Sequence, residues 1–191
     1  MNFKNIKFIK SVMFLNDRPA FALPEIAVVG RSNVGKSSLI NTVFQRRHLA
    51  KISSTPGKTR LMNYFSVDNI FYLVDLPGYG YAKVSKSEQK KWKEMIENFF
   101  TCNQSLILTL LLIDSRHNIM ENDRLMISWL DTFQIPFVII MTKKDKLSNN
   151  KFNIQYKNIH TIYSGIEIIP FSAKSAQGRD EIINVIKRTV D

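Results

Sequence analysis

The eight residues from Gly30 to Ser37 have the types and the spacing needed to bind phosphate groups. Their sequence, GRSNVGKS, matches the pattern G-x-x-x-x-G-K-[ST]. The glycines let backbone N–H groups approach phosphate oxygens, and the helix that follows adds the positive end of its dipole. Lys36 is expected to reach the β- and γ-phosphates, and the Ser37 hydroxyl to bind Mg²⁺. The predicted phosphate-binding loop consists of Gly30, Arg31, Ser32, Asn33, Val34, Gly35, Lys36 and Ser37.

A second candidate segment, DLPG, consists of Asp75, Leu76, Pro77 and Gly78 and ends another apolar run. A carboxylate at this position can hold Mg²⁺ through a water molecule, and the Gly78 N–H can contact a γ-phosphate. On its own, Asp-x-Pro-Gly is more often only a turn. Because it follows the phosphate-binding loop by one strand, the segment is interpreted as a switch element.

Two further segments could recognise a guanine base. The first, TKKD, is made of Thr142, Lys143, Lys144 and Asp145. A carboxylate can accept hydrogen bonds from guanine N1–H and N2–H₂, a pair of donors that adenine lacks, and such buried contacts discriminate between bases. The Lys143 stem could lie along the base plane. The second segment, made of Phe171, Ser172 and Ala173, could supply a backbone N–H to guanine O6.

Short apolar runs alternate with amphipathic stretches along the chain. Buried strands are expected over Glu25–Gly30, Ile70–Asp75, Leu106–Asp114, Pro136–Thr142 and Ile166–Phe171. Helices are expected over Lys36–Phe44, Ser87–Phe100, Glu121–Phe133 and Arg179–Val190, and outer strands over Phe8–Leu15 and Tyr64–Val67. The alternation predicts an α/β fold, with a doubly wound, mostly parallel sheet flanked by helices. Ligands of such sheets bind beyond the carboxyl ends of the strands, where all four motifs fall.

These four motifs, in this order, resemble those of the translation-factor-related P-loop GTPases. A narrower resemblance is to the EngB (YihA/YsxC) family. It rests on five stretches spread over nearly the whole chain: GRSNVGKSS at 30–38, STPGKTRLMNYF at 54–65, DLPGYGYAKV at 75–84, TKKD at 142–145 and FSAK at 171–174. Thr142 stands where most GTPases carry Asn and agrees with the Thr-Lys-x-Asp pattern of that family. The resemblance implies one GTPase domain over residues 1–191, with a short N-terminal extension over residues 1–22.

The resemblance also implies a first switch segment that touches the nucleotide, formed by Gly57, Lys58, Thr59, Arg60 and Leu61. Thr59 resembles the threonine that joins Ser37 on Mg²⁺, so the two would form the metal site. Thr55 is a competing candidate for this role. The implied activity is hydrolysis of GTP to GDP and phosphate.

The residue that follows Gly78 bears on how hydrolysis occurs. In Ras-like enzymes a glutamine there orients the attacking water. Here the residue is Tyr79, which resembles the hydrophobically substituted GTPases. Asn33 matches the position that helps some relatives hold an activating K⁺ ion. Its alternative role is loop structure alone, since Asn tolerates the backbone of turns. Catalytic roles are thus predicted for Lys36, Asn33 and Thr59, with slow hydrolysis unless K⁺ or a partner completes the site.

Basic residues are concentrated in the first half of the chain. The net charge is +11; residues 1–95 carry 16 Lys+Arg and 6 Asp+Glu, a balance of +10, and the remainder carries 11 and 10, a balance of +1. Such an excess favours polyanionic partners, although it could also serve solubility alone. Ten of these basic side chains flank the predicted nucleotide site: Arg46, Arg47, Lys51, Lys58, Arg60, Lys83, Lys86, Lys90, Lys91 and Lys93. They suggest contact with RNA that depends on the bound nucleotide. Trp92, Phe99 and Phe100 are expected in the core rather than as base-stacking platforms.

In the resembled family, the role is assembly of the large ribosomal subunit, with a requirement in normal cell division and septation. Two alternatives stay open. One is a P-loop kinase or ATPase, which Asp145 and the lack of an evident lid disfavour. The other is a GTP-dependent regulator of a protein partner in septation that never touches RNA.

Cys102 is alone, so an internal disulfide is excluded and a reducing cytoplasm fits. The most apolar run, 106–113, is too short to span a bilayer. The expectation is a cytoplasmic monomer that binds GTP and GDP, uses Mg²⁺ and contacts no membrane.

Overall fold

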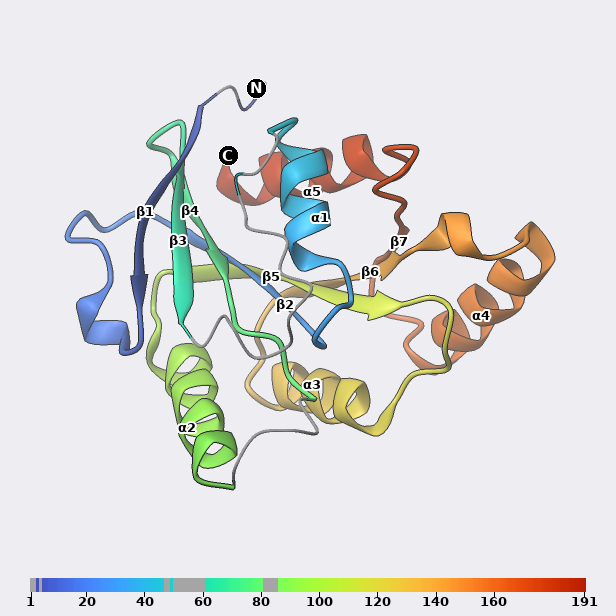
Figure 1. The fold of residues 1–191 in the computed structure, drawn as a ribbon, viewed down its shortest axis with the longest axis horizontal. Coiled ribbons are helices and arrows are strands. Elements are labelled where there is room, and N and C mark those ends of the chain that lie inside the picture. Colours follow the sequence, from blue (N-terminus) through green and yellow to red (C-terminus); the bar gives the residue numbers. More distant parts are fainter. Residues whose placement is uncertain (1–2, 4, 47–48, 50–60, 81–85) are drawn as a thin grey trace.

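The computed structural model describes residues 3, 5–46, 49, 61–80 and 86–191, and for 86, 88 and 89 the backbone alone. Among these residues, seven strands form one sheet in the order β1-β3-β4-β2-β5-β6-β7 (Figure 1). Their bounds are β1 Ile6–Val12, β2 Glu25–Gly30, β3 Met62–Val67, β4 Phe71–Asp75, β5 Leu106–Asp114, β6 Phe137–Thr142 and β7 Ile168–Pro170. Strand β3 runs antiparallel to both β1 and β4, whereas the pairs among β4, β2, β5, β6 and β7 are parallel.

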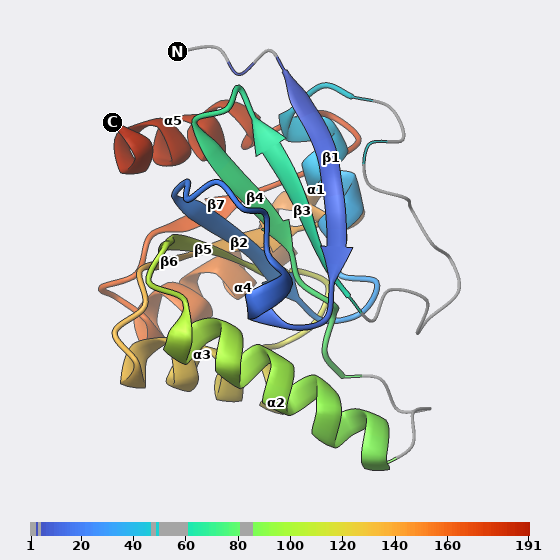
Figure 2. The ribbon, with the colours of Figure 1, turned by 90° about the vertical axis from the view of Figure 1, so that its left-hand side faces the viewer.

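Within the described part of the chain, five α-helices cover the two faces of the sheet: α1 Lys36–Val43, α2 Lys86–Cys102, α3 Glu121–Thr132, α4 Asn149–Ile162 and α5 Arg179–Val190. Helices α1 and α5 lie over one face and α2, α3 and α4 over the other (Figure 2). Strands β2 and β4 are buried along their whole length because both of their faces are covered. Two short 3₁₀ helices, η1 Leu15–Asp17 and η2 Lys144–Lys146, complete the described elements.

The predicted α/β class and doubly wound sheet are confirmed. Strands β2 and β5 and helix α5 have the bounds expected from the sequence, and most other elements differ by one or two residues. The predicted strand over 166–171 is wrong in length, because β7 pairs with β6 over only three residues. Phe99 and Phe100 are buried and Trp92 packs against the core, which confirms the prediction for these three aromatics.

The sequence patterns did not predict helix α4. Its 14 residues include four asparagines, which have low helix propensity. Only Phe152 and Ile159 are buried, whereas Ile154 and Ile162 are exposed and break the apolar period. Strand β1 lies inside the expected N-terminal extension and adds an edge to the sheet. Among the described residues, no helix combines the length and the apolar character needed to cross a membrane.

Candidate nucleotide-binding site

The Gly30–Ser37 loop joins the carboxyl end of β2 to the N-terminus of α1. It turns through two residues with positive φ, Asn33 at 61° and Gly35 at 115°. The Val34 N–H donates to the Arg31 carbonyl at 3.1 Å, and the Leu39 N–H donates to the Gly35 carbonyl at 2.8 Å, which starts the helix. The loop therefore presents the amino end of a helix at the edge of the sheet where the parallel strands finish, as a phosphate site requires.

The Asp75–Gly78 segment packs directly against this loop. A Cβ atom added to Gly78 would lie 2.9 Å from the Lys36 Nζ atom and 2.9 Å from the Ser32 backbone nitrogen. No side chain fits there without displacing the loop backbone, so Gly78 permits the close approach. The ammonium group of Lys36 thus lies beside Gly78, and the two groups predicted to contact a γ-phosphate are brought together.

Asp75, the last residue of β4, is buried beside the same lysine. Burial raises the pKa of Asp75 to about 6, although the charge of Lys36 and a hydrogen bond from Asn63 act in the opposite direction. Its Oδ1 atom has no hydrogen-bond partner among the described residues. A buried acceptor without a donor fits a water molecule held by a metal ion, so the carboxylate suits the indirect Mg²⁺ contact expected from the sequence.

The two segments predicted to recognise a base also meet in space. Ser172 Oγ donates to Asp145 Oδ1 at 2.8 Å, and the Lys144 N–H donates to the Phe171 carbonyl at 3.2 Å. Gly178 permits a close approach to the neighbouring Pro170, because a Cβ atom on it would lie 2.1 Å from the Pro170 carbonyl oxygen. One Asp145 oxygen is thereby oriented by a serine hydroxyl, which fixes the plane of the carboxylate that is expected to face guanine.

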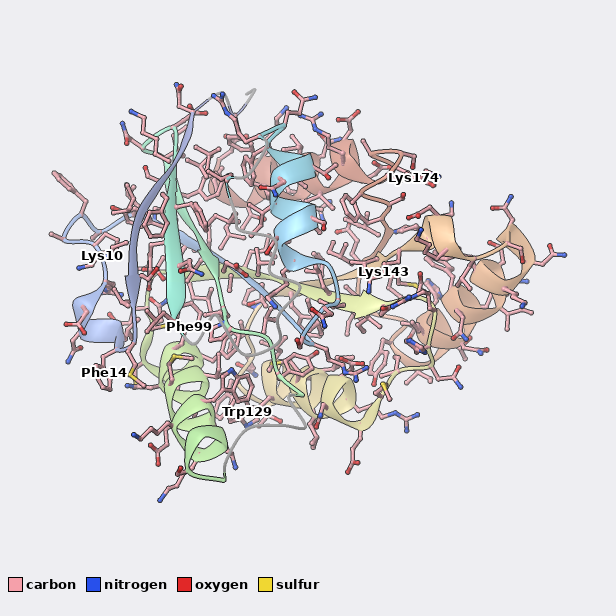
Figure 3. The ribbon with its side chains drawn as sticks, viewed as in Figure 1. Lys10, Phe14, Phe99, Trp129, Lys143 and Lys174 are labelled. Atoms are coloured by element: carbon pink, nitrogen blue, oxygen red, sulfur yellow. The ribbon has the colours of Figure 1, made fainter. Side chains whose placement is uncertain are left out.

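Two side chains of the TKKD segment reach the Gly30–Ser37 loop. Thr142 Oγ1 lies 2.8 Å from the Val34 carbonyl oxygen and donates to it, and Lys143 Nζ donates to the Asn33 carbonyl at 2.6 Å. Lys143 lies at the carboxyl end of β6 (Figure 3). Its ammonium group also contacts Asp114 Oδ2, the last residue of β5, at 2.8 Å. These contacts hold the two predicted loops at a fixed separation.

Asp114 was not singled out from the sequence. Burial raises its pKa, but hydrogen bonds from Arg116 and Lys143 outweigh burial, so the pKa of Asp114 falls to about 2. The carboxylate is therefore a permanent negative charge beside Lys143 at neutral pH. The signal that could have found it is its position as the last residue of a buried strand, which it shares with Asp75.

Tyr79 is buried, and its hydroxyl donates to Asp123 Oδ1, on α3, at 2.7 Å. Asp123 was likewise not singled out, and nothing local to its sequence marks it. Of the predicted first switch segment, only Leu61 is described, and it is 38% exposed. Gly57, Lys58, Thr59 and Arg60, as well as Thr55, lie outside the described residues, as do Arg47, Lys51 and Lys83.

Comparison with known proteins places this arrangement in a family. Residues 25–143 match the family model described as "50S ribosome-binding GTPase". The chain is 44% identical over 189 residues to the "Probable GTP-binding protein EngB" of Kosmotoga olearia, covering 97% of this chain and 99% of that protein. It is 46% identical over 193 residues to the protein of the same name from Pelotomaculum thermopropionicum, covering 100% of this chain and 98% of that protein. The chain belongs to the EngB family of GTP-binding proteins.

Membership of the EngB family makes the chain a GTPase with a P-loop, and the family of P-loop GTPases generally uses Mg²⁺. Solved structures share the fold. A crystal structure of a probable EngB aligns with a TM-score of 0.72 at 24% identity, covering 87% of this chain and 98% of that chain. Era in complex with MgGDPNP and nucleotides 1506–1542 of 16S ribosomal RNA aligns with a TM-score of 0.68 at 23% identity, covering 88% and 57%.

Proposed function

We propose that this EngB-family GTPase is a GTP-gated assembly factor for the large ribosomal subunit, that it acts in the cytoplasm as a monomer, and that normal cell division and septation depend on it. The domain would extend over residues 1–191, with the extension over residues 1–22. The observation that carries the proposal is the match over residues 25–143 to a family described as binding the 50S ribosome. The net charge of +11 agrees with an RNA-rich partner.

Helix α2 is the surface that would link nucleotide to RNA. Lys90, Lys91 and Lys93 are exposed on it. Trp92, on the same helix, donates from its indole Nε1 to the Pro77 carbonyl at 3.2 Å. A change at the Asp75–Gly78 segment would therefore displace a helix that carries exposed positive charge, which is the coupling that a GTP-gated contact needs.

For the nucleotide site we assign the roles expected from the sequence. The residues from Gly30 to Ser37 would bind the phosphates, and Asp145 with the Phe171–Ala173 segment would bind the guanine. The residues from Gly57 to Leu61 would form the part of the first switch that touches the nucleotide. Ser37 and Thr59 would hold Mg²⁺, with Asp75 in contact through water. When bound, the ion would neutralise charge on the β- and γ-phosphates.

Hydrolysis by the chain alone would be slow. The Tyr79 hydroxyl donates to Asp123 inside the core, so this side chain cannot orient an attacking water as a glutamine would. Asn33 is exposed on the loop, where its amide could help to hold a K⁺ ion. A K⁺ ion or a partner would then supply the missing positive charge.

The test is co-sedimentation of the pure protein with isolated ribosomal subunits in K⁺ buffer, loaded with GDP or a non-hydrolysable GTP analogue. Binding to the large subunit mainly in the GTP-like state is expected. The double variant K90E/K91E should weaken it, whereas K151E/K157E, which changes the same charge at exposed positions of α4, should not. Equal binding in both nucleotide states would reject GTP gating, and no binding at any salt concentration would reject the ribosomal role.

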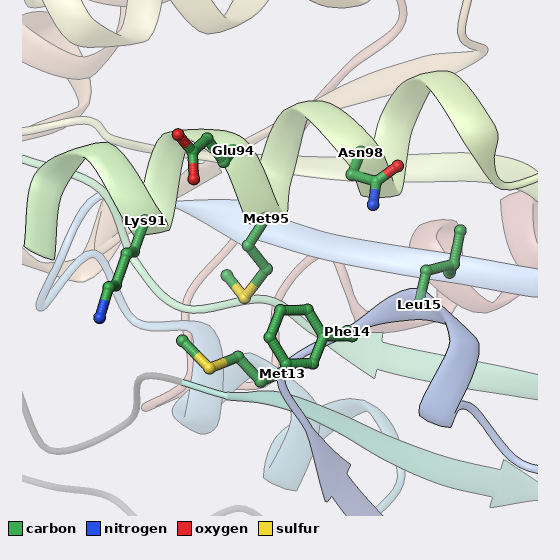
Figure 4. A pocket seen from close by; sticks show the side chains of 7 residues that line it. All are labelled: Met13, Phe14, Leu15, Lys91, Glu94, Met95 and Asn98. Carbon is green, nitrogen blue, oxygen red and sulfur yellow. The ribbon is translucent and has the colours of Figure 1, made fainter.

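One surface feature favours the second candidate, a GTP-dependent regulator of a protein partner in septation. A groove of about 410 Å³ lies between α2 and the turn after β1, with Met13, Phe14 and Met95 inside it and Lys91 and Glu94 at its border (Figure 4). Phe14 is 62% exposed. An apolar side chain of a partner protein would fit this groove better than RNA would. A photo-crosslinking amino acid at position 14, activated in intact cells, distinguishes the two candidates, because its adduct forms either with the large ribosomal subunit or with a non-ribosomal protein.

A further inference from the structure

A buried hydrogen bond connects Tyr79, the residue directly after the Asp75–Gly78 segment, with helix α3. The Tyr79 hydroxyl donates to Asp123 Oδ1 at 2.7 Å, and both side chains are buried. Asp123 is the third residue of α3, and its second oxygen accepts a hydrogen bond from the Met120 N–H at 3.2 Å. The carboxylate therefore caps the helix and holds the tyrosine at the same time.

Electrostatics favour a hydrogen bond in which the Tyr79 hydroxyl donates and the Asp123 carboxylate accepts. Burial raises the pKa of Asp123 above its ordinary value, and the hydrogen bonds from the Tyr79 hydroxyl and the Met120 N–H, with the nearby charge of Arg31, offset this only in part. Burial, together with the Asp123 carboxylate, raises the pKa of Tyr79 well above its ordinary value, so the phenol remains the donor. Arg31, which belongs to the Gly30–Ser37 loop, also contacts the Met120 sulfur through Nη1.

The backbone of Tyr79 is fixed as firmly as its side chain. Its carbonyl accepts a hydrogen bond from the Ser32 N–H at 2.9 Å, and its N–H donates to the Gly30 carbonyl at 3.3 Å. Gly78, directly before it, lies against Lys36 and Ser32. The orientation of the Gly78 peptide is thus determined by a residue that is held on one side by the loop and on the other by α3.

We propose that Asp123 is a positioning residue for GTP: by anchoring the Tyr79 side chain, it orients the Gly78 N–H toward the γ-phosphate before GTP binds. The inference rests on the nucleotide site proposed above. Asp123 itself touches no nucleotide and acts through Tyr79. Because GDP has no γ-phosphate, the anchor contributes to the binding of GTP and leaves the binding of GDP unchanged.

The experiment measures the dissociation constants of a non-hydrolysable GTP analogue and of GDP for the full chain and five variants. Tyr79→Phe removes only the hydroxyl and keeps the ring against Trp92. We expect it to weaken analogue binding roughly fivefold to tenfold, as the loss of one charge-assisted hydrogen bond would, with GDP affinity within about twofold of the wild type. Asp123→Ala should have the same selective effect, and Asp123→Asn, whose amide oxygen still accepts from the phenol, should restore most of the analogue affinity.

The double variant Y79F/D123A distinguishes positioning from independent damage. If both residues act through one hydrogen bond, the double variant should weaken analogue binding no more than either single change does. Tyr64→Phe is the matched control, because Tyr64 is another buried tyrosine whose hydroxyl donates to a buried carboxylate, Glu25, at 3.2 Å. It should lower the melting temperature but leave the ratio of analogue to GDP affinity at the wild-type value.

The proposal is overturned if Tyr79→Phe leaves the affinity ratio unchanged, or if it weakens GDP and the analogue equally. Either result would assign the pair to stability alone. A wild-type chain that binds neither guanine nucleotide would overturn the proposed nucleotide site instead, so the two failures are distinguishable. Thermal unfolding of each variant, measured without nucleotide, shows whether a variant that binds the analogue weakly is still folded.

Discussion

Lys143 Nζ donates a hydrogen bond of 2.6 Å to the main-chain carbonyl of Asn33, although 110 residues separate the two along the chain. The contact joins the TKKD segment to the Gly30–Ser37 loop, and Asp114 holds the same ammonium group at 2.8 Å. The two ends of the proposed nucleotide site are thus connected through one lysine, whose position depends on a carboxylate at the end of β5.

Replacing Asp114 by Asn should weaken GDP and GTP binding together. The variant removes the charge that holds Lys143, and a lost charge-assisted hydrogen bond corresponds to about tenfold in affinity, or about 1.4 kcal/mol. Titration with a fluorescent GDP analogue measures the effect. Arg116→Gln is the control, since Arg116 pairs with the same carboxylate but, among the hydrogen bonds of the described residues, makes none to the Gly30–Ser37 loop. If Asp114→Asn and Arg116→Gln weaken nucleotide binding equally, Asp114 acts through the local charge balance and not by holding Lys143.

Asp145→Asn should shift the base preference from GTP to xanthosine triphosphate. Guanine offers N1–H and N2–H₂ donors to a carboxylate, whereas xanthine presents a carbonyl at C2, which an amide NH₂ can donate to. The preference for GTP should fall by about 100-fold or more, because a buried donor would lose its partner. Competition between the two triphosphates measures the change. Asp180→Asn, at an exposed carboxylate on α5, should leave the preference unaltered. Retained GTP preference in Asp145→Asn would remove Asp145 from the base site.

Asn33 variants test whether its side chain helps to hold K⁺. Asn33 has a φ of 61°, which glycine adopts freely and alanine does not. If the amide is a K⁺ ligand, both Asn33→Gly and Asn33→Ala should lose the excess GTP turnover in K⁺ over Na⁺. A glycine variant that keeps the K⁺ stimulation, next to an alanine variant that loses activity in both salts, would show that Asn33 serves the backbone alone.

The stability of the fold should depend on pH through Glu25, at the far end of β2. Burial raises the pKa of Glu25 above its ordinary value of 4.5, and hydrogen bonds from Asn103 and Tyr64 only partly offset this. The protonated form therefore favours the folded state. Its contribution is fully present below pH 4.5 and is lost as the pH rises through the higher pKa of the folded protein.

Glu25→Gln should remove this dependence. The unfolding free energy of the variant minus that of the wild type should be larger at pH 8 than at pH 4.5, as measured by urea denaturation at both pH values. Glu97→Gln, which removes one negative charge from the exposed face of α2, is the control for net charge. If the wild type and Glu25→Gln show the same difference at both pH values, the burial of Glu25 has no influence on its ionisation.

Much of the fold could be predicted from the sequence because the central strands are apolar on both faces. Glu25–Gly30 and Leu106–Asp114 have the predicted bounds, since a continuous apolar run that is mostly buried leaves little ambiguity between strand and surface helix. Helix α4 could not be predicted, because its stability comes from packing two apolar residues, Phe152 and Ile159, rather than from propensity.

The parts of the site that lie on one continuous segment could be predicted, whereas the contacts between segments could not. The backbone conformation of a segment such as GRSNVGKS depends mainly on the residues within that segment. The pairs formed by Tyr79 with Asp123, and by Asp114 with Lys143, join residues 44 and 29 positions apart. Tyr79 and Lys143 lie beside or within predicted motifs, but the sequence does not indicate which residues they pair with, and only the assembled sheet and helices bring the partners together.

The contact of Trp92 with Pro77 has a spectroscopic consequence. The chain has two tryptophans. Trp92 lies against the Asp75–Gly78 segment: its indole N–H donates to the Pro77 carbonyl, and its ring centroid lies 6.3 Å from that of Tyr79. Trp129, on α3, packs instead against Phe133. In a Trp129→Phe background, the emission wavelength and lifetime of the remaining indole would be an intrinsic optical signal for movement of this segment, recorded without any attached dye.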